Sequence, residues 1–154
     1  MKRLYLDSSA LVKLYLAEPE SERLSEFVRQ CEEPLPYTSL HELEFTQALE
    51  RRQSIGDISA KQAERVRALV ESDLAKGILL RIELAWPGIF AAAIRLLRRH
   101  GRQPGLRSVD SLHIACALGN KDGVFVTFDQ RQRRAATAEK METWPDGPTI
   151  ISPA

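Results

Sequence analysis

Short apolar runs alternate along this chain with longer segments in which apolar residues recur every three or four positions. Short continuous runs are typical of buried strands, and a spacing of three or four is typical of helices that bury one face. The pattern predicts strands over residues 2–6, 36–38, 78–84, 124–128 and 149–151. It predicts helices over about 9–16, 20–32, 40–53, 59–76 and 109–119, one that follows Trp86 and Pro87 to about His100, and one from about 130 onwards.

Strands that are separated by helices predict an α/β fold, because parallel neighbours in a sheet need long crossover connections. We therefore expect three layers, with a mostly parallel sheet of about five strands and helices on both of its faces. In such sheets, ligands bind beyond the carboxyl ends of the strands. A length of 154 residues fits one domain, so we expect a single domain over 1–154.

Charge and composition restrict the classes of function. The chain has 22 basic and 21 acidic residues and a formal charge of +1, so any site for a polyanion must be local. No apolar run approaches the roughly 20 residues that a membrane helix needs. The first apolar run is interrupted by Asp7 and Lys13, which argues against an export signal. With no CxxC motif, Cys31 and Cys116 are expected to be free thiols, and we expect a cytoplasmic protein.

Two aspartates directly follow predicted strands. Asp7 separates two apolar runs in LYLDSSALVKLYL, and Asp129 follows the run VFVTF. A carboxylate beside buried surface must be paired, hydrogen-bonded or bound to a metal, because the burial of an isolated charge is costly. Capping of the next helix is a sufficient local explanation for either residue, since Asp is a favoured N-cap.

Two further acids lie early in predicted helices. Asp110, in RSVDSLHIACAL, shares a helix face with Ile114, and Ser108 already suits the cap position. The alternative is that Asp110 is simply an acid in the first turn, where the helix dipole stabilises negative charge. In TSLHELEFTQALERR both Glu42 and Glu44 can approach apolar surface, and periodicity weakly favours Glu44. Salt bridges to the arginines that end this stretch are the alternative for either glutamate.

The four positions together are better explained by a cation than by four separate local roles. Carboxylates that gather without compensation repel one another, which raises their pKa values and lowers stability. A set of oxygen ligands without a Cys or His cluster suits the hard ions Mg²⁺ or Mn²⁺.

Four motifs in this order resemble the PIN-domain nucleases, and most closely the toxin ribonucleases of the VapC type. They are D-[ST]-S at 7–9, E-x-x-x-A-L at 44–49, D-x-L-H-x-A-x-A at 110–117 and T-x-D at 127–129. The resemblance spans nearly the whole chain and selects Glu44 over Glu42. No acidic position of the family pattern is missing.

The resemblance implies a metal-dependent endoribonuclease that acts as the toxin of a toxin–antitoxin pair. In that case Asp7, Glu44, Asp110 and Asp129 hold one or two Mg²⁺ or Mn²⁺ ions, which activate a water molecule for attack on the phosphate. The expected partners are a cognate antitoxin, a second copy of the chain in a homodimer, and a structured RNA such as tRNA or rRNA.

Other side chains are candidates for supporting roles. Thr127 and Ser9 could orient a carboxylate or a metal-bound water. Arginines near Asp110 and Asp129 are candidates for phosphate contacts, although each could also belong to a solvated helix face. These arginines are Arg98, Arg99, Arg102, Arg107 and Arg131. His113 is expected to be a hydrogen-bonded packing residue rather than a general base.

Three alternatives remain to be compared with this hypothesis. A non-catalytic PIN-like module that binds RNA or acts as a scaffold would keep the fold without cleavage. A phosphohydrolase of the haloacid dehalogenase type needs a second aspartate two residues after the first, where this chain has Ser9. A receiver domain needs an acidic pair on the first strand, which is not apparent here.

Overall fold

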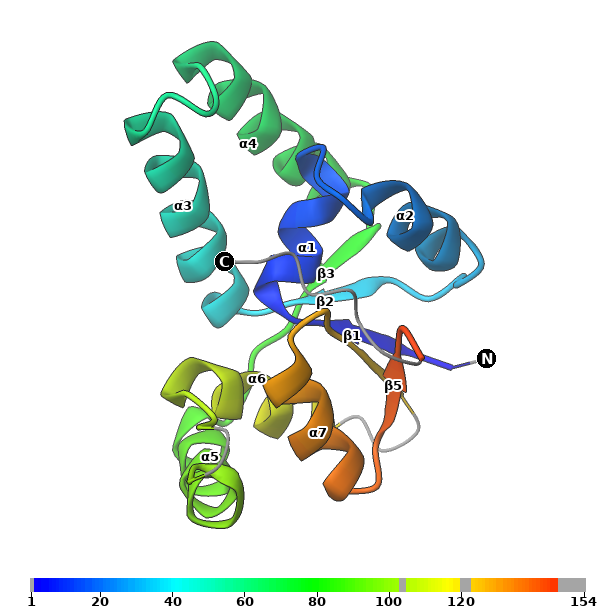
Figure 1. Ribbon diagram of the computed structural model, residues 1–154. Helices are drawn as coiled ribbons and strands as arrows, with labels where there is room; N and C mark the ends of the chain where they lie inside the picture. Colours follow the sequence, from blue (N-terminus) through cyan, green and yellow to red (C-terminus); the bar gives the residue numbers. More distant parts are fainter. Residues whose placement is uncertain (1, 103–104, 120–122, 147–154) are drawn as a thin grey trace. The chain divides into compact units, whose positions relative to one another are not determined.

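The computed structural model describes residues 2–102, 105–119 and 123–146 (Figure 1). Its helices are α1 (Ser8–Tyr15), α2 (Ser21–Arg29), α3 (Ser39–Ser54), α4 (Ala60–Ala75), α5 (Trp86–His100), α6 (Ser108–Leu118) and α7 (Gln130–Ala138). Its strands are β1 (Leu4–Leu6), β2 (Leu35–Tyr37), β3 (Leu79–Arg81), β4 (Val124–Val126) and β5 (Glu142–Trp144). The α/β class and the alternation of strands with helices are confirmed.

The described strands differ from the expected ones in their bounds, and one strand is additional. β1 covers residues 4–6 of the run 2–6, and β4 covers residues 124–126 of the run 124–128. The predicted strand over 78–84 is shorter, since β3 ends at Arg81. The strand β5, whose sequence ETW has no apolar run, was not predicted. The strand predicted over 149–151 lies outside the described residues. Short strands whose pairing is decided by distant partners are the elements that local patterns predict least well.

The chain divides into two compact units, each with its own parallel sheet. One unit is Ser8–Glu83, in which β2 pairs with β3. The other combines Lys2–Asp7 with the described residues from Leu84 onwards, and its strand order is β1-β4-β5. The expectation of one sheet of about five strands is therefore wrong in this detail. All three strand pairs in the described residues are parallel, and β1 pairs with β4 although the whole of the first unit separates them in the sequence.

In the first unit, local hydrogen bonds determine where the helices begin and end. Thr38, directly after β2, is the N-cap of α3: its hydroxyl accepts a bond from the backbone N–H of His41 at 3.3 Å. Ser59 caps α4 through Gln62 in the same way. Beyond α3, Gly56 adopts a positive φ of 76°, which glycine tolerates better than other residues at a helix end.

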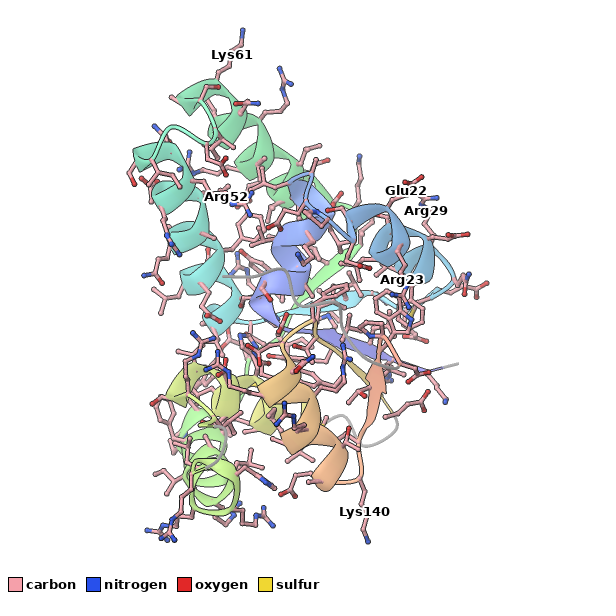
Figure 2. The ribbon with its side chains drawn as sticks, viewed as in Figure 1. Glu22, Arg23, Arg29, Arg52, Lys61 and Lys140 are labelled. Carbon is pink, nitrogen blue, oxygen red and sulfur yellow. The ribbon has the colours of Figure 1, made fainter. Side chains whose placement is uncertain are left out.

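The helix α2 shows how the apolar pattern is used in this unit. Its one fully buried side chain is Leu24. Glu22, Arg23 and Arg29 are exposed and project from the helix (Figure 2). The helix thus buries one narrow face, as an amphipathic surface helix does.

The core of the second unit lies where β1 and β4 pack against three helices. Phe125 of β4 is fully buried and contacts the ring of Tyr5 on β1, at 6.1 Å between ring centroids. Ile114 and Cys116 of α6, together with Leu96 of α5, belong to the same cluster of buried side chains. Burial raises the pKa of the Cys116 thiol to about 11, so this cysteine is a packing residue.

No helix within the described ranges is long and apolar enough to cross a membrane.

Candidate active site

Asp7 lies at the carboxyl end of β1, beside the neighbouring strand β4. Its backbone N–H donates to the carbonyl of Val126 at 3.1 Å, which extends the strand pairing by one residue. Its side chain is only 1% exposed, and its Oδ2 accepts a bond from the hydroxyl of Thr127 at 2.6 Å. The order of the strands thus brings together two side chains that are 120 positions apart in the sequence.

Asp129 is the N-cap of α7, as the local interpretation predicted. Its Oδ1 accepts bonds from the backbone N–H groups of Arg131, at 2.8 Å, and Gln132, at 3.1 Å. Its own N–H donates to the hydroxyl oxygen of Thr127 at 3.1 Å. Thr127 therefore links Asp7 to the residue that begins α7.

Asp110 lies in the first turn of α6 and is 3% exposed. Its Oδ2 accepts bonds from Arg107, at 3.1 Å from the backbone nitrogen and 3.0 Å from Nε. Its Oδ1 accepts a bond from Nε2 of Gln132 at 3.0 Å. Asp110 thus supports the helix end and also contacts a side chain of α7.

These contacts join three of the four predicted carboxylates in one network within the second unit. The path runs from Asp7 through Thr127 to Asp129, and from there through Gln132 to Asp110. Nη2 of Arg107 lies 3.9 Å from Oδ2 of Asp129, so this guanidinium lies near two carboxylates. Its positive charge offsets part of their mutual repulsion.

Glu44 belongs to the first unit, where α3 holds it. Its Oε1 accepts a bond at 2.7 Å from the hydroxyl of Ser8, the residue that follows Asp7 in the chain. Glu42 is exposed and pairs instead with Arg81, at 2.7 Å. Arg52, at the end of α3, pairs with Glu18 and Asp57. The position of Glu44 relative to the aspartates stays a prediction.

The donor chemistry of this network fits a hard divalent cation. Its side-chain ligands are carboxylate and amide oxygens, with no Cys or His, which is the set that Mg²⁺ and Mn²⁺ prefer. Within the described ranges, however, no three His, Cys, Asp or Glu side chains gather closely enough to hold a metal ion. The guanidinium of Arg107 lies against the Asp110 carboxylate. Its side chain is 64% exposed, so it can turn outward into solvent.

The predicted RNA-contact arginines divide into three groups. Arg107 and Arg131 lie against the carboxylates, and Nη2 of Arg131 is 3.6 Å from Oδ2 of Asp129. Nε of Arg99 pairs with Glu139 at 3.3 Å. Arg98 and Arg102 are exposed.

His113 is 2% exposed, and its Nδ1 lies 3.0 Å from the hydroxyl of Tyr5 in the core of the second unit. This is the environment of a packing residue.

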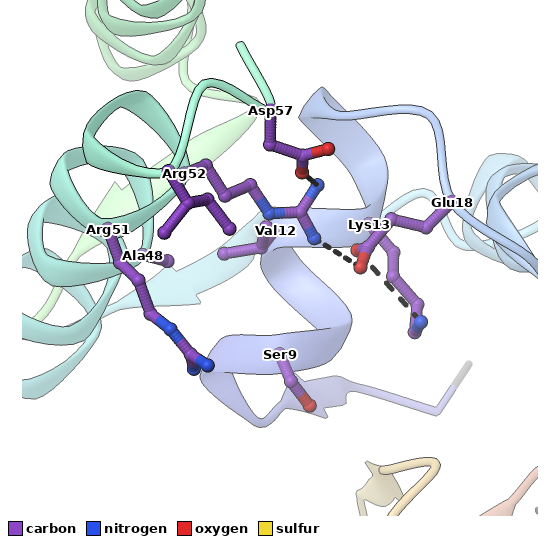
Figure 3. A pocket seen from close by; sticks show the side chains of 9 residues that line it. Ser9, Val12, Lys13, Glu18, Ala48, Arg51, Arg52 and Asp57 are labelled. Carbon is purple, nitrogen blue, oxygen red and sulfur yellow. Dashed lines mark hydrogen bonds and ion pairs between the residues drawn. The ribbon is translucent and has the colours of Figure 1, made fainter. Parts of the chain in front are cut away.

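Ser9 lines a pocket of about 330 Å³ in the first unit (Figure 3). Arg52 lies between Glu18 and Asp57 on one side of this pocket, whereas Ser9 and Arg51 lie on another. The pocket contains none of the four predicted carboxylates.

Gln132 is the residue of the network that sequence reasoning missed. The available signal was its place on the face of α7 that carries Ala135 and Ala136, three and four positions later. Both alanines are buried, so a glutamine on that face is a buried polar side chain that needs partners.

Comparisons with known proteins identify the family of this chain. The PIN domain family model matches residues 4–138. Over 139 residues the chain is 36% identical to Ribonuclease VapC46 of Mycobacterium tuberculosis (strain ATCC 25618 / H37Rv), a match that covers 88% of this chain and 92% of that protein.

Two solved structures share the fold. One is FitAcB from Neisseria gonorrhoeae, with a TM-score of 0.59, 15% identity, and coverage of 91% of this chain and 95% of that one. The other is VapBC2 from Rickettsia felis bound to a DNA fragment from their promoter, with a TM-score of 0.62, 14% identity, and coverage of 92% and 98%.

Proposed function

Because this chain belongs to the PIN-domain family, we propose that it is a metal-dependent endoribonuclease, the toxin of a toxin–antitoxin pair. The observation that carries the proposal is the network that joins Asp7, Asp110 and Asp129 at the carboxyl ends of two adjacent parallel strands. The likeness to Ribonuclease VapC46 supports RNA as the substrate. The family model runs through both units, which supports a single domain over the whole chain.

The proposed mechanism gives the residues of this network distinct tasks. Asp7, Asp110 and Asp129 would hold one or two Mg²⁺ or Mn²⁺ ions, and Glu44 is proposed as a further ligand from its motif position. The bound ion would supply a Lewis acid that lowers the pKa of water and offsets charge on the phosphate. Thr127 fixes the orientation of the Asp7 carboxylate through its hydroxyl. We propose the same orienting task for Ser9.

Positive side chains near these carboxylates would bind the polyanionic substrate. Arg107 and Arg131 are close enough to Asp129 to reach a phosphate held beside it. The exposed Arg98 and Arg102, and Arg99, are proposed as contacts to neighbouring phosphates. The RNA would be a structured one, such as tRNA or rRNA.

We propose that a cognate antitoxin blocks this site and that the chain forms a homodimer in the cytoplasm. The structural likeness to VapBC2 of Rickettsia felis and to VapBC of Salmonella typhimurium is the observation behind the proposed antitoxin partner.

Incubation of the purified protein with total RNA tests the proposal. We expect cleavage with Mg²⁺ or Mn²⁺ and none with a chelator, because the carboxylates need a cation to act on a phosphate. Asp110→Asn should lower cleavage by at least 100-fold. Asp57→Asn, which changes an exposed carboxylate outside the network, is the matched control.

Intact RNA with wild-type protein and metal would contradict the nuclease proposal. It would favour the alternative of a PIN-like module that binds RNA without cutting it. Thermal melting of Asp110→Asn should show that the variant still folds, so that lost cleavage is not lost structure.

A further inference from the structure

Gln132 is a buried polar side chain that contacts two of the three aspartates. It is 5% exposed and lies on the inner face of α7. Its backbone N–H donates to Oδ1 of Asp129 at 3.1 Å, and its Nε2 donates to Oδ1 of Asp110 at 3.0 Å. One residue therefore holds two carboxylates in place, one by its backbone and the other by its side chain.

The carbonyl oxygen of the Gln132 amide takes no part in these contacts. Its Oε1 is buried, and no hydrogen-bond donor among the residues that the structure describes reaches it. Rotation of the amide does not remove the problem, because it would place the carbonyl oxygen against the Asp110 carboxylate and the NH₂ group where no bond is made. Buried carbonyl oxygens in folded proteins nearly always have a partner.

The position of this oxygen indicates what kind of partner it needs. It belongs to the same planar amide as the nitrogen that touches Asp110, so it lies at the carboxylate network. A neutral amide oxygen is a hard donor group like a carboxylate, but it adds no negative charge to a site that already holds three acids. A hydrated divalent cation offers such an oxygen a water hydrogen, since Mg²⁺ retains several of its waters in proteins.

We propose that Gln132 is a positioning residue of the metal site, a role that rests on the proposed function. Its amide nitrogen fixes Asp110 in the orientation that binds the cation, and its carbonyl oxygen accepts a hydrogen bond from a water of the bound cation. Outer groups of this kind change metal affinity by 10- to 100-fold when they are removed. Gln132 would thus set the affinity of the site for its metal.

Direct titration with Mn²⁺ in the absence of RNA tests this role, with isothermal calorimetry as the measurement. Gln132→Leu keeps a side chain of similar size and removes both amide groups. We expect it to raise the Kd for Mn²⁺ roughly 10- to 100-fold. Gln130→Leu is the matched control, because Gln130 lies two residues earlier on the same helix and is only partly buried. It should change the Kd by less than about twofold.

Gln132→Glu provides a second readout if Gln132→Leu folds poorly. The added carboxylate repels Asp110 in the apo protein but attracts a cation. We therefore expect a lower melting temperature than wild type in EDTA and a larger rise in melting temperature on addition of Mn²⁺. If position 132 lies away from the bound cation, the loss of stability should be the same with and without Mn²⁺, and that result would overturn the role of Gln132.

The outcomes separate this inference from the proposed function. Wild-type protein that binds Mn²⁺ together with Gln132→Leu that binds it equally well would overturn the role of Gln132 only. Wild-type protein that shows no Mn²⁺ binding would overturn both the inference and the metal dependence on which it rests.

Discussion

At the scale of single residues, the aspartates combine a local structural role with a place in the carboxylate network. Asp129 caps α7 with one oxygen and faces arginines with the other. Asp110 accepts a backbone N–H at the start of α6 and also binds Gln132. Capping and metal binding are therefore not exclusive, because a carboxylate has two oxygens and about four acceptor positions.

The positively charged side chain of Arg107 fits two roles. The sequence predicts it as an RNA contact, and the structure places its guanidinium on Asp110 and near Asp129. Both roles agree with one physical need, which is positive charge beside clustered carboxylates. In the proposed mechanism, a metal held by these carboxylates would offset the same charge, and Arg107 would be available to the substrate.

Glu44 and Glu42 offer a matched pair for a residue-scale prediction. Both are glutamates in the first turns of α3, but Glu44 bonds to Ser8 and Glu42 pairs with Arg81. We expect Glu44→Gln to lower RNA cleavage by at least tenfold, because it removes one negative charge from the proposed metal ligands. Glu42→Gln should stay within about twofold of wild type. Initial rates on one fluorescent RNA measure both, and equal rates would exclude Glu44 as a ligand.

At the scale of elements, three of the four candidate carboxylates are positioned by a strand that leads into a helix, whereas Asp110 lies in α6, which follows α5. Asp7 stands between β1 and α1, and Asp129 stands three residues after β4, at the start of α7. Glu44 lies in α3, which begins shortly after β2 ends. Such junctions place polar side chains at the carboxyl edges of parallel strands, which is where ligands bind in this fold class.

The cap of α3 yields an element-scale prediction about stability. The hydroxyl of Thr38 accepts a bond from the backbone of His41, and Thr38 is 1% exposed. Thr38→Ala should lower the free energy of unfolding by about 1 kcal/mol, the usual effect of losing an N-cap. Thr38→Ser keeps the hydroxyl and should retain most of that stability. Urea unfolding followed by circular dichroism measures both variants, and equal midpoints would show that this cap contributes nothing.

At the scale of the whole molecule, a net charge of +1 provides no general attraction for RNA. RNA binding must then depend on particular basic side chains close to the carboxylates. Two substitutions that each remove one positive charge should therefore weaken RNA binding by different amounts, depending on their position. This distinguishes a local phosphate site from general electrostatic attraction.

Arg102 and Lys61 test that expectation, since both are exposed and each carries one positive charge (Lys61 is labelled in Figure 2). In EDTA, Arg102→Gln should weaken binding of a short RNA and reduce the slope of log Kd against log salt by about 0.7, the value for one phosphate contact on a single strand. Lys61→Gln should leave the slope unchanged. Fluorescence anisotropy measures both, and equal losses would mean that only total charge matters.

The α/β class, most helix positions, the oxygen-only set of candidate ligands and the family resemblance all follow from local sequence. These depend on periodicity, capping preferences and short motifs, all of which are encoded within a few residues. The selection of Glu44 over Glu42 comes from its motif and stays a prediction; in the structure Glu44 bonds to Ser8 and Glu42 pairs with Arg81.

Only the tertiary structure decided which partners the carboxylates have. The bond from Thr127 to Asp7 joins adjacent strands from opposite ends of the chain, and β5 exists because β4 offers it a parallel edge. The proposed role of Gln132 depends on where α7 packs beside α6. It also depends on the contrast between the amide nitrogen, which bonds to Asp110, and the carbonyl oxygen, which has no donor among the described residues. No local pattern contains that information, because a glutamine in a helix has the same local sequence signal whether its amide faces solvent or a buried aspartate.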